Sequence, residues 1–193
     1  MPFSFSCIRR YIKPKGLLKI LFFLFPLAGC TGIPEGLQPV TGFEAERYLG
    51  KWYEIARLDH SFERNLSHVT AQYSRGEGDE ILVRNRGFDK EKGKWREIEG
   101  VARFIGDKNM GSLQVSFFGP FWGGYHIIAL DKEGYRYAMV SGPSRSYLWI
   151  LSRDKHLEER ILKELIGRAK QWGFETGELI FVEHDRWDPS SKN

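Results

Sequence analysis

The sequence predicts a mainly β protein, an antiparallel sandwich or barrel that is followed by one α-helix. The first observation is that eight short runs rich in β-branched and aromatic residues follow one another at regular spacing. The second is that turn sequences such as GEGD, DKEKG, DKEG and GPSR separate these runs. The third is that one long helical pattern comes after the strands and does not alternate with them, as helices do in βαβ folds.

The expected strands are bounded by glycine, proline and polar turn residues. In chain order they cover residues 51–59, 67–75, 80–87, 94–105, 111–118, 124–131, 135–141 and 146–152. We expect a short final strand from Leu179 to Glu183 and a frayed end over residues 184–193.

The helix is predicted from Asp154 to Gly173. Its apolar residues recur at spacings of three, four and five and form one stripe, as in a helix that lies on the outside of a barrel. These residues are Leu157, Ile161, Leu162, Leu165, Ile166, Ala169 and Trp172. Asp154 is placed to cap the first turn, and Gly173 is placed to end the last one.

Residues 1–29 are expected to be a lipoprotein signal peptide. They combine five basic residues with an apolar run from Leu17 to Leu27 that is too short to span a bilayer comfortably. The sequence LAGC, which ends at Cys30, resembles the lipobox of bacterial lipoproteins. The resemblance implies that Cys30 becomes the lipid-modified first residue, and Thr31 resembles the pattern of lipoproteins sent to the outer membrane. An ordinary secretory signal that happens to contain a cysteine is the alternative.

Removal of the signal peptide changes the charge balance. The whole chain has 29 basic and 25 acidic residues, whereas the mature chain would have 24 and 25, with no basic stripe that would favour a nucleic-acid partner. Cys7 would leave with the signal and Cys30 would carry the anchor, so no cysteine pair remains for a disulfide. We expect residues 30–42 to form the lipidated N-terminus and a tether, and residues 43–183 to form one barrel domain.

Three local patterns resemble those of the lipocalin family. YLGKWYEIAR places Gly50 and Trp52 in the family's Gly-x-Trp position at the start of the first strand. ALDKEGYRYAMV places Asp131 and Tyr135 in its Thr-Asp-Tyr pattern, with a leucine in place of the threonine. YLWILSR precedes Asp154 and ends at Arg153, which matches the arginine that closes the family's eighth strand.

The resemblance covers residues 43–182 and implies an eight-stranded antiparallel up-and-down lipocalin β-barrel with the helix packed outside it. In such a barrel the first and last strands meet. Gly50, Trp52 and Arg153 are therefore expected to close one end, with the Arg153 guanidinium over the Trp52 ring and its remaining N–H groups on carbonyls of residues 42–50. Two unrelated surface residues are the alternative for Trp52 and Arg153.

Strand direction places the turns after the first and fifth strands at the opposite, open end, which we call the mouth. We expect Phe62, Phe121 and Trp122 there, as an apolar border that suits a ligand with a hydrocarbon tail or a nearby membrane. The alternative is that Phe121 and Trp122 fold back and only cover the barrel edge.

Side-chain alternation along the strands predicts the lining of the barrel. With Trp52 inward, Glu54 and Ala56 face the same side. Together with positions that the lipocalin resemblance implies, the expected ligand-binding residues are Ala56, Tyr73, Val83, Asn85, Phe117, Tyr125, Ile127, Tyr147 and Trp149. A barrel of this size holds one small ligand, and an apolar lining favours an acyl chain.

The sequence gives little support to catalysis. The five histidines lack metal-ligand spacing, no Gly-x-Ser-x-Gly motif or phosphate loop occurs, and Glu54 has no evident partner. We expect no enzyme, cofactor or metal. The expected function is the binding of fatty acids or lysophospholipids for storage, transport or repair, by a protein anchored to the outer membrane through Cys30 and facing the periplasm, with pairing of two barrels left open. The alternative is a structural or protein-interaction lipoprotein of the envelope with a filled barrel.

Overall fold

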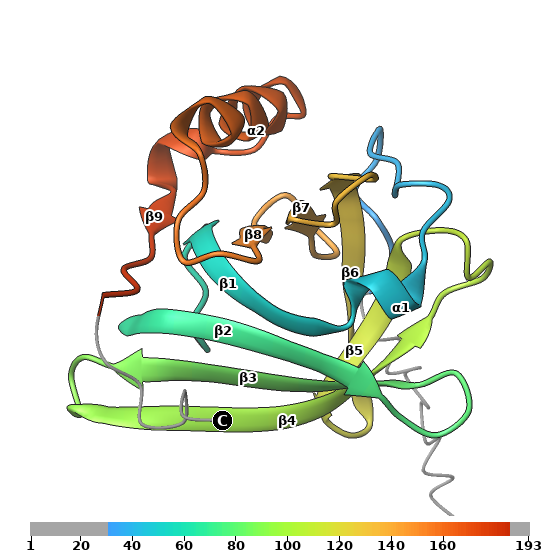
Figure 1. Ribbon diagram of the computed structural model, residues 1–193, viewed down its shortest axis with the longest axis horizontal. Helices are drawn as coiled ribbons and strands as arrows, with labels where there is room; N and C mark the ends of the chain where they lie inside the picture. Colours follow the sequence, from blue (N-terminus) through green and yellow to red (C-terminus); the bar gives the residue numbers. More distant parts are fainter. Residues whose placement is uncertain (1–30, 186–193) are drawn as a thin grey trace, which may run out of the picture.

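The computed structural model describes residues 31–185, so the expected signal peptide, Cys30 and the end of the tail lie outside the described part. One nine-stranded sheet closes into a barrel because β1 pairs with β2 on one side and with β8 on the other (Figure 1). The strands are β1 (Gly50–Arg57), β2 (Leu66–Arg75), β3 (Ile81–Asp89), β4 (Lys94–Phe104), β5 (Ser112–Phe118), β6 (Phe121–Leu130), β7 (Tyr137–Ser141), β8 (Leu148–Ser152) and β9 (Ile180–Phe181). The predicted eight-stranded antiparallel barrel is confirmed, and β9 adds a short strand beside β1.

The β5–β6 hairpin is longer than the sequence suggests. β6 begins at Phe121 and not at Gly124, because Phe121 pairs with Phe118 across the turn formed by Gly119 and Pro120. This pairing extends β6 beyond the end of β7, because the last residue of β7, Ser141, pairs with His126.

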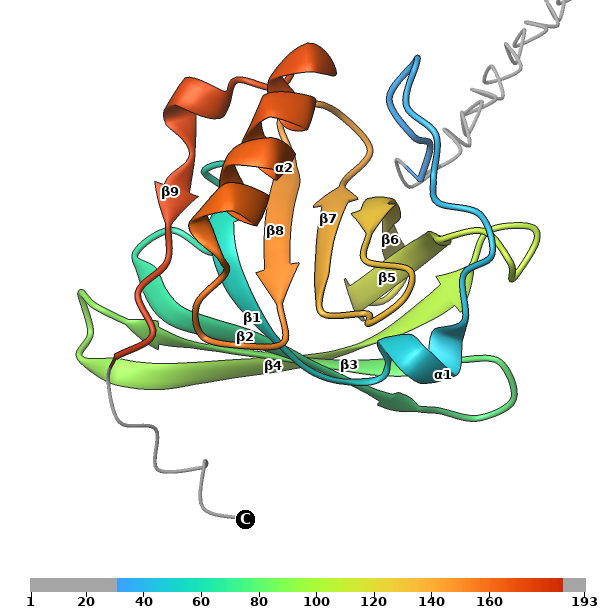
Figure 2. The ribbon, with the colours of Figure 1, turned by 45° about the horizontal axis from the view of Figure 1, so that its top comes forward.

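The predicted helix lies on the outside of the barrel as α2 (Glu159–Gln171), as Figure 2 shows. Leu165 and Ala169 are buried against outward-facing residues of β1, β6, β7 and β8, including Ile128 and Ile150. Gly173 ends the helix with a φ of +81°, as expected. The predicted cap at Asp154 is wrong, because the helix begins five residues later and Glu158 occupies the cap position, where its side chain makes no capping hydrogen bond.

The C-terminal segment after α2 forms a shorter strand than expected, but it packs closely on the barrel. Only Ile180 and Phe181 are paired as strand, after the short helix η1 (Thr176–Glu178), although the Val182 N–H also donates to the Ile55 carbonyl. His184, which we expected to begin a frayed tail, is buried, and its Nε2–H donates to the Glu54 carbonyl oxygen over 2.7 Å. Packing on β1 therefore orders the chain to this residue.

Residues 31–42, which we expected to form a tether with an irregular entry to the barrel, lie along β5 and β6. The Val40 N–H donates to the Ile127 carbonyl, and the Gly111 N–H donates to the Val40 carbonyl. Leu37 is buried in the cluster beneath α2. A helix of one turn that the sequence did not reveal, α1 (Ala45–Tyr48), then leads into β1.

The three sequence patterns of the first, seventh and eighth strands meet at the closed end of the barrel. The guanidinium carbon of Arg153 lies 3.9 Å from the centre of the Trp52 ring. Its N–H groups donate to the carbonyls of Tyr135, Lys51 and Arg47 over 3.1, 3.0 and 2.8 Å. The expected contact between Trp52 and Arg153 is thus present, although only one of the three carbonyls belongs to residues 42–50.

Gly50 is required by this arrangement for two reasons. Its φ is +97°, a conformation that costs little only for glycine. A Cβ at this position would also lie 3.2 Å from Arg153 Nη1. The glycine of the Gly-x-Trp pattern therefore leaves room for the arginine that closes the barrel.

We expect the substitution Arg153→Ala to lower the free energy of unfolding by about 2–4 kcal/mol, because it leaves three carbonyls without their charged donor and removes the cation–π contact. Urea unfolding measures this change. Arg136→Ala is the matched control, because Arg136 makes an exposed ion pair with Asp131 and its loss should cost less than 1 kcal/mol. Equal effects of the two substitutions would contradict the structural role given to Arg153.

Candidate ligand-binding site

The inner face of the barrel gathers most of the side chains that alternation predicts. Tyr73, Val83 and Ile127 are buried in the interior cluster, and Phe117, Tyr125 and Trp149 pack against it. Asn85 faces the same side, because it pairs with Ala71, and Ala71 in turn pairs with Trp52. The rings of Phe43, Tyr48, Trp52 and Tyr135 occupy the closed end. The wall between the closed end and the mouth is therefore apolar with few polar groups.

Ala56 does not belong to this lining, so its assignment as a ligand-binding residue is wrong. A β-bulge between Glu54 and Ala56 shifts the phase of β1, and Ala56 lies in the cluster beneath α2, opposite Ile150. The same shift turns Arg57 toward the interior, opposite the inward Trp149. Arg57 is 1% exposed.

A buried charged cluster lies just inside the mouth, at the level where β1 ends. Arg57 Nη1 donates to Glu54 Oε1 over 2.6 Å. Arg57 Nη2 donates to the carbonyls of Glu63 and Leu66 over 2.9 and 3.1 Å. The Trp149 indole N–H donates to Glu63 Oε2 over 2.9 Å. Arg57 and Glu63 therefore hold the loop between β1 and β2 against Trp149 of β8 at the mouth.

Sequence reasoning found Glu54 but missed its two partners. Arg57 is placed inward only by the bulge, and Glu63 belongs to a loop whose path no alternation predicts. A usable signal was the presence of three carboxylates and one arginine within residues 54–63, around the first turn.

Burial raises the pKa of Glu54 to about 8, and the neighbouring Glu63 carboxylate adds to this rise, while Arg57 opposes it. Burial also raises the pKa of Glu63, although the Trp149 hydrogen bond and Arg57 oppose the rise. Two carboxylates and one guanidinium are buried close together, so the cluster favours retention of a proton. Burial lowers the pKa of the adjacent His60 to about 4.

Stacked rings cover the cluster at the mouth. The His60 ring lies 5.3 Å from the Phe62 ring and 4.8 Å from the Tyr147 ring, in both cases nearly parallel. Tyr147 also stacks on Trp149. The inward placement predicted for Tyr147 and Trp149 thus brings both to the mouth, and Phe62 remains 56% exposed on top of the stack.

Polar groups deeper in the barrel form a second feature. Tyr125 OH lies 2.8 Å from both Tyr48 OH and Tyr73 OH, so three hydroxyls form one chain. Two hydrogen bonds use two of the three hydroxyl protons, which leaves one for another acceptor. Asn85 Oδ1 is buried and has no hydrogen-bond partner within residues 31–185. The interior therefore offers both a donor and an acceptor to a guest molecule.

The residues expected at the mouth behave differently from one another. Phe121 is 60% exposed at the hairpin tip, whereas Trp122 is half-buried beneath the Arg103 guanidinium at 4.9 Å. Trp122 therefore folds back on the outer surface of the barrel, as the alternative interpretation expected, whereas Phe121 does not.

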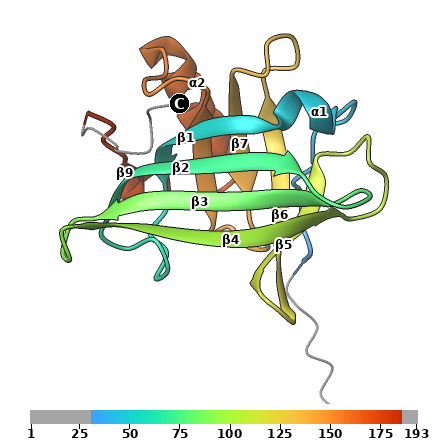
Figure 3. The same cartoon turned by 60° about the horizontal axis from the view of Figure 1, so that its bottom comes forward.

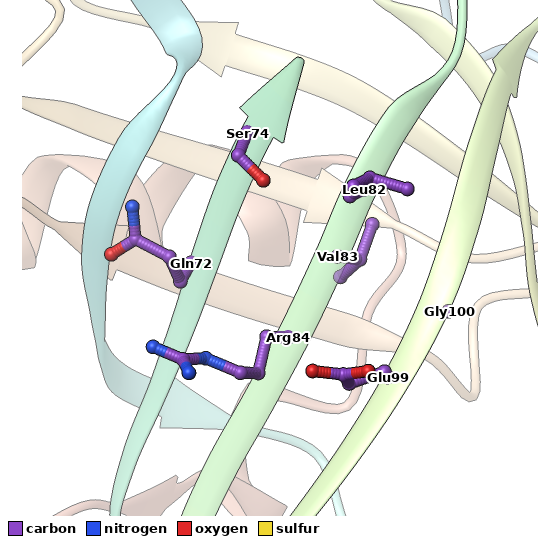
Figure 4. Close-up of a pocket in the computed structure, with 7 residues that line it drawn as sticks. All are labelled: Gln72, Ser74, Leu82, Val83, Arg84, Glu99 and Gly100. Atoms are coloured by element: carbon purple, nitrogen blue, oxygen red, sulfur yellow. The ribbon is translucent and has the colours of Figure 1, made fainter. Parts of the chain in front are cut away.

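A hollow of about 240 Å³ lies on β2, β3 and β4 (Figure 4). Its lining includes the outward-facing Gln72, Ser74, Arg84 and Glu99, and Figure 4 shows these polar side chains along the strands. This charged outer surface does not suit a hydrocarbon chain, so we place the candidate ligand site on the inner face.

No group of three or more His, Cys, Asp or Glu side chains within residues 31–185 could hold a metal ion. Over the same residues, no helix is long and apolar enough to cross a membrane.

Comparison with known proteins agrees with this geometry. Residues 43–184 match the family model described as a lipocalin-like domain. The chain belongs to the lipocalin family. Lipocalins are carriers of small hydrophobic ligands, so the chain is a carrier protein and not an enzyme.

Relatives of this lipocalin include "Outer membrane lipoprotein Blc" of Vibrio cholerae, which is 54% identical over 81% of this chain and 92% of the relative. The Escherichia coli K12 protein of the same name is 48% identical over 78% of this chain and 84% of its own. Among solved structures, insecticyanin from the tobacco hornworm Manduca sexta is similar with a TM-score of 0.62 and 21% identity, over 83% of this chain and 89% of that chain. The last similarity supports the fold alone.

The raised pKa of Glu54 predicts a pH-dependent stability of this lipocalin. Between about pH 6.5 and 8.5 the folded protein retains a proton that an unfolded chain, with the ordinary carboxyl pKa of 4.5, has already lost. The free energy of unfolding should therefore fall by roughly 1–2 kcal/mol as the pH rises through this window. Burial lowers the pKa of His60, His126 and His184, so they act in the opposite sense, mainly below their ordinary pKa of 6.5.

Urea unfolding at pH 6.5 and 8.5 measures the effect, and Glu54→Gln should remove most of it. Glu133→Gln, at an exposed turn position, is the control and should keep the full decrease. A decrease of the same size in Glu54→Gln would show that another group titrates.

Proposed function

We propose that this lipocalin is an outer-membrane lipoprotein that binds fatty acids or lysophospholipids inside its barrel and carries, stores or repairs lipids of the cell envelope. The proposal rests on the composition of the inner face of the barrel, between the closed end, where Arg153 covers Trp52, and the mouth. It combines rings and aliphatic side chains with one buried amide oxygen and one chain of tyrosine hydroxyls. An amphiphile with one hydrocarbon tail and a small polar head has the same two chemistries.

The anchoring part of the proposal rests on residues before the described chain. LAGC resembles a lipobox, and relatives that share about half of the residues are named outer membrane lipoproteins. We infer that residues 1–29 are removed and that Cys30 is acylated. Two or more acyl chains hold a protein stably on a membrane. The protein would then face the periplasm.

Access to the interior is controlled by the loop between β1 and β2. Arg57 binds its backbone carbonyls, and Trp149 binds the Glu63 carboxylate. A guest that enters through the mouth displaces this loop or threads beside it. When one of the Glu54 and Glu63 carboxyl groups keeps its proton, the other carboxylate balances the charge of Arg57. The net charge at the entrance is then close to zero, which favours passage of an acyl chain.

A pair of substitutions on β3 tests binding inside the barrel. Val83 is buried on the inner face, and its neighbour Leu82 is 44% exposed on the outer face. Val83→Trp should fill part of the interior and weaken the binding of a fluorescent fatty acid at least tenfold, whereas Leu82→Trp should change it less than twofold. The mature chain with Cys30→Ser is used, so that its own acyl groups do not compete.

Circular dichroism first establishes that both variants fold. Unchanged binding by folded Val83→Trp would contradict a site inside the barrel. Failure of the parent protein to bind the fatty acid would favour the alternative, a structural or protein-interaction lipoprotein with a filled barrel.

A further inference from the structure

β1 and β2 pair with each other only in the half of the barrel near its closed end. Residues 50–53 of β1 pair with residues 70–73 of β2. Toward the mouth, β1 continues to Arg57 and β2 begins at Leu66, and no pairing joins these upper halves within the described residues. If β1 and β2 alone formed this side of the wall, it would be split along its upper half.

The C-terminal segment fills this split. We call residues 180–185 the strap. The Val182 N–H donates to the Ile55 carbonyl of β1 over 3.0 Å, and the His68 N–H of β2 donates to the Glu183 carbonyl over 2.8 Å. Figure 3 shows β1, β2, β3 and β4 side by side, with β9 at the end of β1 near the start of β2. The strap therefore completes the wall by bonding to both strands.

The backbone of β2 is shaped to meet the strap. A β-bulge between Ser67 and Thr70 interrupts the ladder with β3, and His68 lies within this bulge. The φ of His68 is +56°, a conformation that residues other than glycine adopt rarely. In this conformation the His68 N–H is directed to the strap and not to β3. The irregularity of β2 therefore has a specific use.

Most strap side chains bury little surface. His184 is its buried side chain, with Nε2–H donating to the Glu54 carbonyl over 2.7 Å and the ring packed edge-on against Tyr53. The two residues paired with β1 are exposed, Ile180 by 38% and Phe181 by 58%. A segment with few buried apolar contacts opens at a lower cost in free energy than the core strands do.

The split leads directly to the charged cluster inside the mouth. The Glu54 carbonyl binds His184 of the strap, while the Glu54 side chain binds Arg57 within the cluster. Arg57 Nη2 also donates to the Leu66 carbonyl at the start of β2 over 3.1 Å. The inner link between the upper halves of β1 and β2 is thus a side chain, which can change partners more easily than a β-ladder.

We propose that the strap is a lateral gate of the barrel, and that its release lets the upper halves of β1 and β2 separate so that the tail of a guest passes sideways. Arg57 and Trp149 hold the loop between these strands at the mouth. Release of the strap frees the strands that carry this loop, so the split and the mouth open together. The inference rests on the lipid binding proposed above and adds the step that sets the rate of exchange.

A reversible disulfide across the gate tests this role. Ala56 and Phe181 are directly opposed, and opposed residues of antiparallel strands have Cα atoms about 4.5–5.5 Å apart, within the range of a disulfide. The mature chain with Cys30→Ser has no other cysteine, so Ala56→Cys with Phe181→Cys creates one pair. Oxidation of this pair should slow the exchange of a bound fluorescent fatty acid at least tenfold in stopped-flow measurements. Reduction should restore the rate, which separates locking from the effect of the substitutions themselves.

A second disulfide serves as the matched control. Arg84→Cys with Glu99→Cys joins β3 and β4, which are already paired on the outer face, and its oxidation should change the exchange rate less than twofold.

Loosening the strap should have the opposite effect. His184→Ala removes the bond to the Glu54 carbonyl and should speed the exchange at least threefold. His156→Ala, at an exposed position before α2, should change it less than twofold.

The outcomes separate the gate from the binding itself. Unchanged exchange in the oxidised 56–181 pair, in a protein that binds the fatty acid, would overturn the gate and leave the mouth as the only route. Equal slowing by both disulfides would also overturn it, because general stiffening of the barrel would then explain the effect. A parent chain that binds no fatty acid would refute the proposed function and this inference with it.

Discussion

The position of β1 between β2 and β8 is the constraint on which the rest of the structure depends. By pairing with both strands it converts an open meander into a barrel and creates an inner face that is separated from solvent. The closure also brings together three segments far apart in the chain, because Arg153 from the end of β8 reaches carbonyls before β1 and after β6 while it covers Trp52. One guanidinium thus seals the base and links the three sequence patterns.

The bulge in β1 gives the two ends of the barrel different chemistry. Below the bulge, Trp52 faces inward and joins the rings of the closed end. Above it, the phase changes, so that Ala56 supports α2 and Arg57 enters the interior. One extra residue in one strand therefore converts an apolar base into a mouth with a buried charged cluster. The same cluster fastens the loop between β1 and β2, which couples protonation at the mouth to the stability of the fold.

The sequence was sufficient for the strands and for the closed end, but not for the mouth. Runs rich in β-branched and aromatic residues, separated by turn residues, located all eight barrel strands within a few residues. Trp52 and Arg153 were predictable because barrel closure requires the first and last strands to meet. The inward turn of Arg57, the burial of His184 and the packing of residues 31–42 depend on contacts between distant segments. Composition correctly marks residues 31–42 as irregular, but an irregular segment can still pack, and here hydrogen bonds to β5 and β6 hold it in place.

In the proposed function, the sealed base and the apolar interior that opens at the mouth provide one path for a lipid molecule. Native mass spectrometry of the acylated protein, extracted gently from its membrane, tests the central claim most directly. We predict a population that carries one additional fatty acid or lysophospholipid, which dissociates at moderate collision energy and is replaced when another is supplied. A protein that emerges only at the mass of its own acylated chain, and that accepts no added lipid, would contradict the claim.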